Sequence, residues 1–285
     1  MSSSSFDAVR NTKASDRPAE YEPGSLVHIF WTSGWDSTYR LIELSRMPVT
    51  VEPVYCIDRG RKSIEIEKSA MNEILKQLRA KPETKAEILP IKEIDIALLP
   101  ENKDITKAFK TILASGHIGS QHEWLAKAAL DYPGIEIGIE KPIGALGGCT
   151  SALSKFAEMV QVNGMWKIDP SASSWEALQI FGNLTFPILG INELEMLDNI
   201  KRWGYEDVMS HIWFCLVPIN GRPCGVCHSC TLKIERGMGW LLPPEAHKRY
   251  KRHQRIKAMM NLPVIGLPLR ALREVKRKFH AIINS

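Results

Sequence analysis

The sequence predicts an α/β fold, in which a parallel sheet with helices on both faces is followed by a smaller α-helical lobe. Three observations support this prediction. Short apolar runs alternate with helix-like segments over the first half of the chain, four cysteines gather in one short stretch of the second half, and basic residues concentrate beyond them. Strands that alternate with helices are typical of parallel sheets with right-handed crossovers.

Apolar runs bounded by turn residues predict the strands. Residues 27–31 precede a Thr-Ser-Gly turn, so we expect a buried strand there. Residues 51–57 form a second such run, and Pro90 ends a third run at 86–89. A fourth strand is expected at 134–139. Ligands of such sheets bind at the carboxyl ends of the strands, where the strand order changes direction.

Helices are predicted between these strands, because apolar residues recur there at helical spacing. The three segments are 37–46, 64–78 and 124–130. In the longest of them the apolar positions are Ile66, Met71, Ile74, Leu75 and Leu78.

Composition bounds the class of protein. The chain has 285 residues, of which 44% are hydrophobic and 24% charged, as in globular proteins. This length suits one large α/β domain or two small ones. The apolar stretch 262–269 is too short to span a bilayer, and residues 1–24 lack the apolar region of a signal peptide. We expect a cytoplasmic protein, with peripheral membrane association as an alternative.

We expect four parts along the chain. Residues 1–24 are rich in Ser, Asp, Glu and Pro and predict a flexible arm, or an arm that orders on a partner. Residues 25–142 hold the α/β core, and residues 143–240 form a lobe that carries the clustered cysteines. Residues 241–285 form a basic amphipathic tail.

The loop after the first strand has the composition of an anion-binding loop. It runs from Thr32 to Thr38 and opens a helix. Small residues let backbone N–H groups approach a ligand closely, and a helix N-terminus supplies donors and partial positive charge. This combination suits phosphate or pyrophosphate, although the sequence contains no Walker A motif. The alternative is that Asp36 or Ser37 only caps the helix.

The loop resembles the pyrophosphate loop, S-G-G-x-D-S, of the PP-loop ATP pyrophosphatases. Gly34, Asp36 and Ser37 match that motif, whereas Thr32 replaces its serine and Ser33 its first glycine. The resemblance implies a Rossmann-like fold of the adenine nucleotide alpha hydrolase (HUP) type. It also implies ATP as cosubstrate and activation of a substrate oxygen as an adenylate, with stabilisation of the leaving pyrophosphate by the loop.

The resemblance implies a set of nucleotide-binding residues. In the loop these are Thr32, Ser33, Gly34, Asp36, Ser37 and Thr38. Asp36 and Ser37 are the implied catalytic residues, and Asp36 is expected to help hold Mg²⁺, which prefers carboxylate and phosphate oxygens. Asp58 and Arg61 follow the second strand and are also expected to reach ATP, although a solvated loop is an equal alternative.

Four cysteines form the second motif. Cys215, Cys224, Cys227 and Cys230 lie within sixteen positions. Since we expect a reducing compartment, the cluster predicts a metal site rather than disulfides. Four thiolates suit a structural, tetrahedral Zn²⁺, with an iron–sulfur cluster as the alternative. His228 lies between two of the cysteines and is a weaker candidate ligand.

The cysteine spacing resembles the zinc site of the 7-cyano-7-deazaguanine synthases, the QueC-like branch of the PP-loop group. There a cysteine ends a T-W-S-C-like stretch and C-G-x-C-x-x-C follows; here the matching stretches are 212–215 and 224–230. The resemblance covers roughly residues 27–239. It departs at 144–150, where a Y-P-D-C-R-like segment is missing, and at 120–122, where an Arg-Asn pair is missing. These departures predict an altered acceptor pocket, so an acceptor other than a deazaguanine is expected and a deazaguanine is the alternative.

These observations predict an ATP-dependent ligase of QueC-like type. It would adenylate a small-molecule acceptor, expected to be a carboxylate, and release pyrophosphate. Ammonia or an amine would then attack and give an amide or a nitrile. The alternatives are a PP-loop tRNA-modifying enzyme of thiolation type, and a non-catalytic adaptor that binds ATP and zinc. Assembly as a homodimer is also left open.

Single residues near these motifs have two interpretations each. Gln121 and His122 would contact nucleotide or transfer a proton, or would have surface and capping roles. Cys149 would be a nucleophile or sulfur carrier, or an inert buried thiol. Trp35 would stack on adenine, or pack within the loop.

Charge is distributed unevenly along the chain. The formal net charge is +5, yet the stretch from Lys248 to Lys278 holds eleven Lys and Arg and one acid, Glu274. That stretch therefore carries +10 and the remainder −5. Its second half, 270–283, predicts a basic amphipathic helix. The tail would bind an anionic membrane surface or a nucleic acid, or would pack on the body with its charges solvated.

Overall fold

The computed structural model describes residues 8–9, 21–116 and 118–260. The chain divides into two compact units, Met1–Trp213 and Phe214–Ser285. The four parts that we expected along the chain, with boundaries at 24, 142 and 240, stay a prediction. Residues 184–185, which fall in the expected lobe, form a strand of the central sheet of the first unit.

A six-stranded sheet forms the centre of the first unit, and all of its described pairings are parallel. The strands are β1 (Leu26–Phe30), β2 (Thr50–Ile57), β3 (Glu87–Ile88), β4 (Lys92–Asp95), β5 (Ile135–Glu136) and β8 (Leu184–Thr185). Their order is β3-β2-β1-β5-β8, and β4 also pairs with β2. The predicted α/β fold with a parallel sheet is therefore confirmed, and each of the four predicted strands overlaps an observed one, with β1 and β2 beginning one residue earlier than predicted.

Strands β3 and β4 pair one after the other with the same edge of β2. Strand β3 pairs with residues 50–51 of β2 and β4 with residues 54–57, in both cases opposite β1. Pro90 lies between the two short strands and has no N–H to donate to a ladder. The sequence predicted β3 and its end at Pro90, but not β4.

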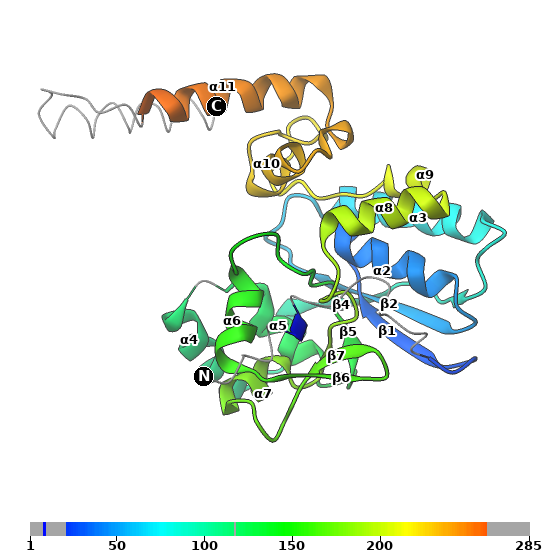
Figure 1. The fold of residues 1–285 in the computed structure, drawn as a ribbon, viewed down its shortest axis with the longest axis vertical. Coiled ribbons are helices and arrows are strands. Elements are labelled where there is room, and N and C mark those ends of the chain that lie inside the picture. Colours follow the sequence, from blue (N-terminus) through cyan, green and yellow to red (C-terminus); the bar gives the residue numbers. More distant parts are fainter. Residues whose placement is uncertain (1–7, 10–20, 117, 261–285) are drawn as a thin grey trace, which may run out of the picture. The chain divides into compact units, whose positions relative to one another are not determined.

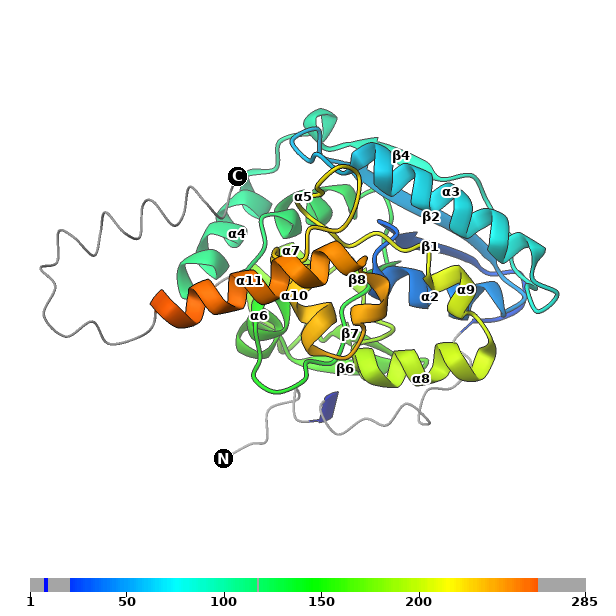
Figure 2. The ribbon, with the colours of Figure 1, turned by 90° about the horizontal axis from the view of Figure 1, so that it is seen from above.

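Helices cover both faces of the sheet (Figures 1 and 2). One face carries α2 (Trp35–Ser45), α3 (Ile64–Ala80), α8 (Glu193–Trp203) and α9 (Glu206–Met209). The other carries α4 (Lys103–Ser115), α5 (Gln121–Ala128), α6 (Gly148–Phe156) and α7 (Trp175–Phe181). Successive side chains of β2 point to opposite faces of the sheet. Val54 and Cys56 point to one face and join the core beneath α4–α7. Between them, Tyr55 donates a hydrogen bond to Glu67 of α3.

An antiparallel hairpin extends this second face. It consists of β6 (Met159–Val162) and β7 (Met165–Ile168). Asn163 and Gly164 join the strands with φ of 51° and 76°, which is the two-residue turn that Asn-Gly favours. Trp166 of β7 and Phe186, which follows β8, form an isolated antiparallel β-bridge.

The N-terminal segment is described only in part. Val9 is fully buried and belongs to the core cluster of the first unit, so this residue is not part of a solvated arm. The rest of the arm predicted at 1–24 is described only at Ala8 and from Tyr21 onward.

The second unit is helical in its described part. It contains α10 (His228–Glu235), the short 3-10 helix η3 (Gly239–Leu241) and α11 (Pro244–Met260). The amphipathic helix predicted at 270–283 lies outside the described residues. None of the described helices has both the length and the apolar character needed to cross a membrane.

Candidate functional site

The loop between β1 and α2 has one residue in the left-handed region. Ser33 has a φ of 55° and is fully buried. L-residues pay a steric cost in this conformation and glycine does not, so the backbone here has the shape that a glycine would adopt most easily. Two hydrogen bonds hold it: the Ser33 hydroxyl donates to the Thr32 carbonyl at 2.6 Å, and Trp213 N–H donates to the Ser33 carbonyl at 2.9 Å.

Helix α2 begins directly after this loop without a side-chain cap. Gly34 is the N-cap residue, with extended backbone angles and no capping hydrogen bond from a side chain. The first intrahelical bond runs from Thr38 N–H to the Gly34 carbonyl at 3.0 Å. The N–H groups of the residues before Thr38 therefore make no i to i−4 hydrogen bond within α2. Such N–H groups, together with the helix dipole, are typical of helix termini that bind anions.

The end of β5 lies against the same helix terminus. A Cβ atom added at Gly138 would lie 2.8 Å from the backbone nitrogen of Ser37. Only glycine permits this approach. Because β5 and β1 are neighbours on the two sides of the point where the strand order reverses, the loop lies where parallel sheets bind ligands.

The predicted loop residues differ in their accessibility. Thr32, Gly34 and Asp36 are half-buried, and Ser37 is buried. Thr38 is fully buried, and its hydroxyl accepts the Trp31 indole N–H at 3.0 Å. Thr38 therefore has a clear packing role, and phosphate binding by its hydroxyl stays a prediction.

A buried ion pair fixes α2 to the sheet. Arg40 donates from Nε and Nη2 to the two carboxylate oxygens of Glu136, at 2.8 and 2.7 Å. Both side chains are almost fully buried, and Glu136 belongs to β5. Tyr21 donates a further hydrogen bond to Glu136, at 2.8 Å. Our sequence prediction missed this pair, although the carboxylate of Glu136 inside the apolar run 134–139 was a usable signal.

Asp58 and Arg61 lie just beyond β2, at the edge of the sheet that also carries the loop. Asp58 accepts the Gly60 N–H at 3.0 Å, so its carboxylate orders the turn. The Arg61 guanidinium lies 3.1 Å from the carboxylate of Glu67. Buried Glu67 also accepts the hydroxyls of Ser63 at 2.6 Å and Tyr55 at 2.9 Å. Burial and the neighbouring Glu67 raise the pKa of Tyr55, so it remains a donor.

The other single residues that we expected near the site have contacts typical of packing rather than of catalysis. His122 is buried, with Nδ1 3.0 Å from the Gly119 carbonyl and its ring at the edge of Phe181. Burial lowers the pKa of His122, so the ring is neutral near pH 7. Gln121 is exposed. Trp35 is buried in the first turn of α2, which favours loop packing over stacking on a nucleotide.

Cys149 has the surroundings of an inert thiol. It lies in the first turn of α6 and packs against the core of the first unit. Burial raises its pKa well above the ordinary range. Because the thiolate is the reactive form, this environment argues against a nucleophile or sulfur carrier at this position.

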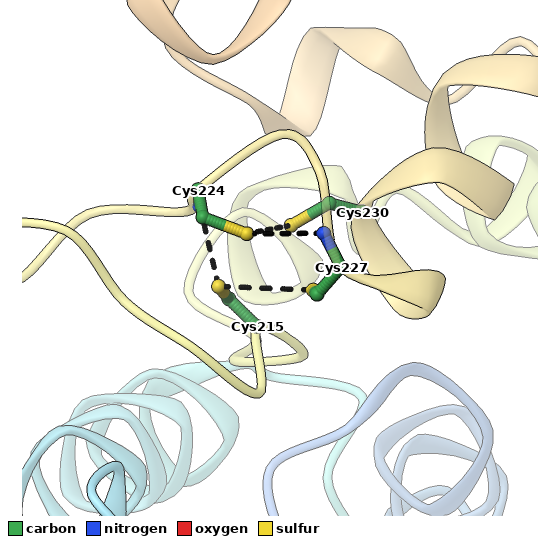
Figure 3. Close-up of side chains that lie close together, drawn as sticks. All are labelled: Cys215, Cys224, Cys227 and Cys230. Carbon is green, nitrogen blue, oxygen red and sulfur yellow. Dashed lines mark hydrogen bonds between the residues drawn. The ribbon is translucent and has the colours of Figure 1, made fainter. Parts of the chain in front are cut away.

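The four clustered cysteines come together in the second unit (Figure 3). Their sulfur atoms all lie within 4.8 Å of one another. Cys224 and Cys230 are 3.9 Å apart at sulfur, and Cys215 and Cys227 are 4.0 Å apart. Four ligands at 2.3 Å in a tetrahedron have sulfurs about 3.8 Å apart, whereas disulfide sulfurs are about 2.05 Å apart. The cluster therefore fits a tetrahedral metal ion such as zinc.

Local turns build this cluster from the sequence. Asn220 and Gly221 have φ of 50° and 70°, and Ile219 and Arg222 exchange two backbone hydrogen bonds of 3.0 Å. This is an Asn-Gly hairpin turn, and it returns the chain from Cys215 to Cys224. Our sequence prediction identified the ligands but not this hairpin, for which the Asn-Gly dipeptide was the signal.

Backbone amides point at the sulfur atoms. Cys224 N–H donates to the sulfur of Cys215 at 3.2 Å, and Cys227 N–H to the sulfur of Cys224 at 3.2 Å. Such outer contacts orient ligands and stabilise thiolates. The neighbouring sulfur of Cys215 lowers the pKa of Cys224. His228 is exposed and does not belong to the cluster.

Three of the four sulfur ligands are buried. Cys215, Cys224 and Cys230 are almost completely inaccessible, and Cys227 is half-buried. A closed set of four thiolates leaves no open position on the metal, which is typical of a structural rather than a catalytic site.

Comparison with known proteins gives no family for this chain. No protein-family model matches it, and no curated protein matches it.

Proposed function

We propose that this protein is an ATP-dependent ligase of the PP-loop type, similar to the QueC-like branch. In this reaction a carboxylate oxygen of the acceptor attacks the α-phosphorus of ATP, and the bond to pyrophosphate breaks. Ammonia or an amine then attacks the acyl carbon, loses a proton and displaces AMP. The product is an amide, or a nitrile after a second activation with loss of the amide oxygen.

The observation that carries this proposal is the geometry of residues 32–38. A left-handed Ser33 and an uncapped Gly34 precede the N-terminus of an eleven-residue helix. This terminus lies beside β5, at the reversal of strand order. Backbone amides arranged in this way stabilise the negative charge that develops on a leaving pyrophosphate.

The loop side chains have distinct roles in this proposal. The hydroxyls of Thr32 and Ser37 and the first amides of α2 hold the phosphates. Asp36 lies in the first turn of α2, and its carboxylate would hold Mg²⁺, which neutralises phosphate charge when bound. Arg61 lies across the adjacent strand end, where Glu67 fixes its guanidinium, and it would contact ATP.

The acceptor is proposed to be a carboxylate other than a deazaguanine precursor. Residues 144–148, which lead into the first residue of α6, contain no acidic or basic side chain. Gly144 and Gly148 adopt φ of 89° and 52°. Such a segment offers backbone groups rather than charges to an acceptor.

Two other functions predicted from the sequence have less support. A thiolation enzyme needs a reactive sulfur carrier, and half-buried Cys149 packs against the core of the first unit, where burial raises its pKa and disfavours the reactive thiolate. A non-catalytic adaptor would bind ATP without turnover, and the experiment below distinguishes it.

Pyrophosphate release from ATP with a panel of carboxylates and ammonia tests the proposal. The intact chain is expected to release pyrophosphate only with a suitable acceptor, and Asp36→Ala to reduce the rate at least tenfold. Asp104→Ala is the matched control, because Asp104 occupies the first turn of α4 and is exposed. Unchanged acceptor-dependent release by Asp36→Ala would show that the loop has another role.

A further inference from the structure

Helix α11 is fixed to the cysteine loop by its first turns. Arg249 donates from Nε to the Cys224 carbonyl at 2.7 Å and from Nη2 to the Pro223 carbonyl at 3.1 Å. Gly225 packs so closely on the Ala246 carbonyl that a side chain there would collide with it. Tyr250 donates to Glu235 of α10 at 3.1 Å. One face of α11 is therefore occupied within its own unit.

The opposite face of α11 carries a row of cations. Lys248, Lys251, Arg252 and Arg255 are spaced i, i+3, i+4 and i+7, so they share one face of the helix. All four are exposed. In the part of the chain that the structure describes, no acidic side chain lies within ion-pair distance of any of them. We call these four residues the cationic row.

The charge of this helix is not compensated within the helix or in the residues that follow it. Helix α11 contains six Lys and Arg and a single acid, Glu245. The following residues, 261–285, add five more Lys and Arg and one acid, Glu274. Like charges at this density repel one another, and a polyanion is the partner that relieves the repulsion.

The composition of α11 favours a nucleic acid over a lipid surface. A helix that lies in a membrane interface needs a broad apolar face to insert. The described side chains of α11 include no exposed large apolar residue, and the face opposite the cationic row is used by Ala246, Arg249 and Tyr250. Phosphate contacts, in contrast, need only cations at regular spacing.

We propose that the cationic row of α11 binds the phosphate backbone of a nucleic acid, and that Arg249 holds the row in place against the cysteine loop. The four side chains span two turns of a regular helix, so they present charge along a line. They make backbone contacts without reading the sequence, since the phosphate backbone carries no sequence information. This inference does not depend on the proposed ligase activity.

Binding of the full chain to a fluorescein-labelled RNA hairpin, measured by anisotropy across a salt series, tests this proposal. We expect a quadruple variant to bind the RNA at least tenfold more weakly at about 100 mM salt. This variant combines Lys248→Gln, Lys251→Gln, Arg252→Gln and Arg255→Gln. The slope of log affinity against log salt should become shallower by about 3, because each phosphate contact contributes about 0.7 to 0.9.

The control removes the same charge elsewhere. Lys76, Lys92, Lys103 and Lys201 are exposed residues of the first unit, and their combined replacement by Gln should change the affinity less than threefold. Equal weakening by both quadruple variants would overturn the proposal, because it would show a net-charge effect only. Absence of RNA binding would also overturn it, as would binding only to vesicles of phosphatidylcholine and phosphatidylserine, which would assign the surface to a membrane.

Discussion

Arg40 of α2 and Glu136 of β5 form a bidentate ion pair in the interior of the first unit, with nitrogen–oxygen distances of 2.8 and 2.7 Å. The pair joins the helix that follows the candidate phosphate loop to the strand that lies against its N-terminus. Only four residues, 31–34, join the end of β1 to the start of α2. The shape of this short loop therefore depends on how firmly α2 is held. We infer that this ion pair positions the loop.

Loss of one partner should cost more than loss of both. Glu136→Leu removes both bonds of the bidentate pair and leaves the buried Arg40 guanidinium with Glu43, 3.1 Å away, as its remaining carboxylate, so we expect the free energy of unfolding to fall by about 3 kcal/mol. Replacing both partners, Arg40→Leu with Glu136→Leu, should recover part of that loss because the fully buried guanidinium is removed together with the carboxylate that balanced it, and only Glu43, at the margin of the pair, loses its ion pair. Urea unfolding of the three variants measures this. A loss below about 1 kcal/mol in the single variant would contradict a structural role for the pair.

A methyl group at Gly138 should disturb the loop. The added Cβ would meet the Ser37 nitrogen at 2.8 Å, so the backbone must shift. We expect Gly138→Ala to weaken ATP binding on the order of tenfold or more, since small misplacements of a site are costly. Isothermal titration with ATP and Mg²⁺ measures it. Gly116→Ala is the control, because a Cβ there meets open space, and it should bind ATP as the parent does.

Stability should fall when His122 becomes protonated. Burial lowers the pKa of His122 in the folded chain, whereas in the unfolded chain it is about 6.5. The unfolded state therefore binds the proton more readily, and stability decreases as the pH falls below about 6.5. We expect His122→Asn to lose less stability than the parent between about pH 7.5 and pH 5, as measured by urea unfolding. Parallel pH profiles of the two proteins would contradict this.

Metal removal should loosen the second unit. We expect one zinc per chain by elemental analysis and no visible absorption, which excludes an iron–sulfur cluster. Chelation, or Cys230→Ser, should remove the metal and increase amide hydrogen exchange in both the cysteine loop and α11, because Arg249 joins them. Cys149→Ser is the control and should keep its zinc. Unchanged exchange in α11 after metal loss would contradict the coupling.

The sequence was most informative where the signal is local. The strand at 27–31, the Thr-Ser-Gly turn after it and the four cysteines each lie in one short segment, and these predictions of strand, loop and metal cluster could be made from spacing alone. Strand β4 was missed because Lys92–Asp95 lies at a sheet edge with charged and half-exposed side chains, so it has no apolar run.

Contacts between residues far apart in the chain could not be predicted, because they leave no local pattern in the sequence. Arg40 and Glu136 are 96 positions apart, and no local pattern states which buried carboxylate a buried guanidinium will meet. Arg61 was expected to face solvent or ATP, and its contact with Glu67 depends on the packing of α3 on β2. The hairpins at Asn163 and Asn220 did carry a local signal, the Asn-Gly dipeptide, which our prediction did not use.

The products of ATP turnover test the central proposal most directly. The intact chain, incubated with ATP, Mg²⁺, ammonia and the carboxylate panel, should convert ATP to equal amounts of AMP and pyrophosphate, and only when an acceptor is present. Chromatography of the nucleotides with an enzymatic pyrophosphate assay measures both. Formation of ADP and phosphate, or tight ATP binding without any AMP across the panel, would contradict an adenylating ligase.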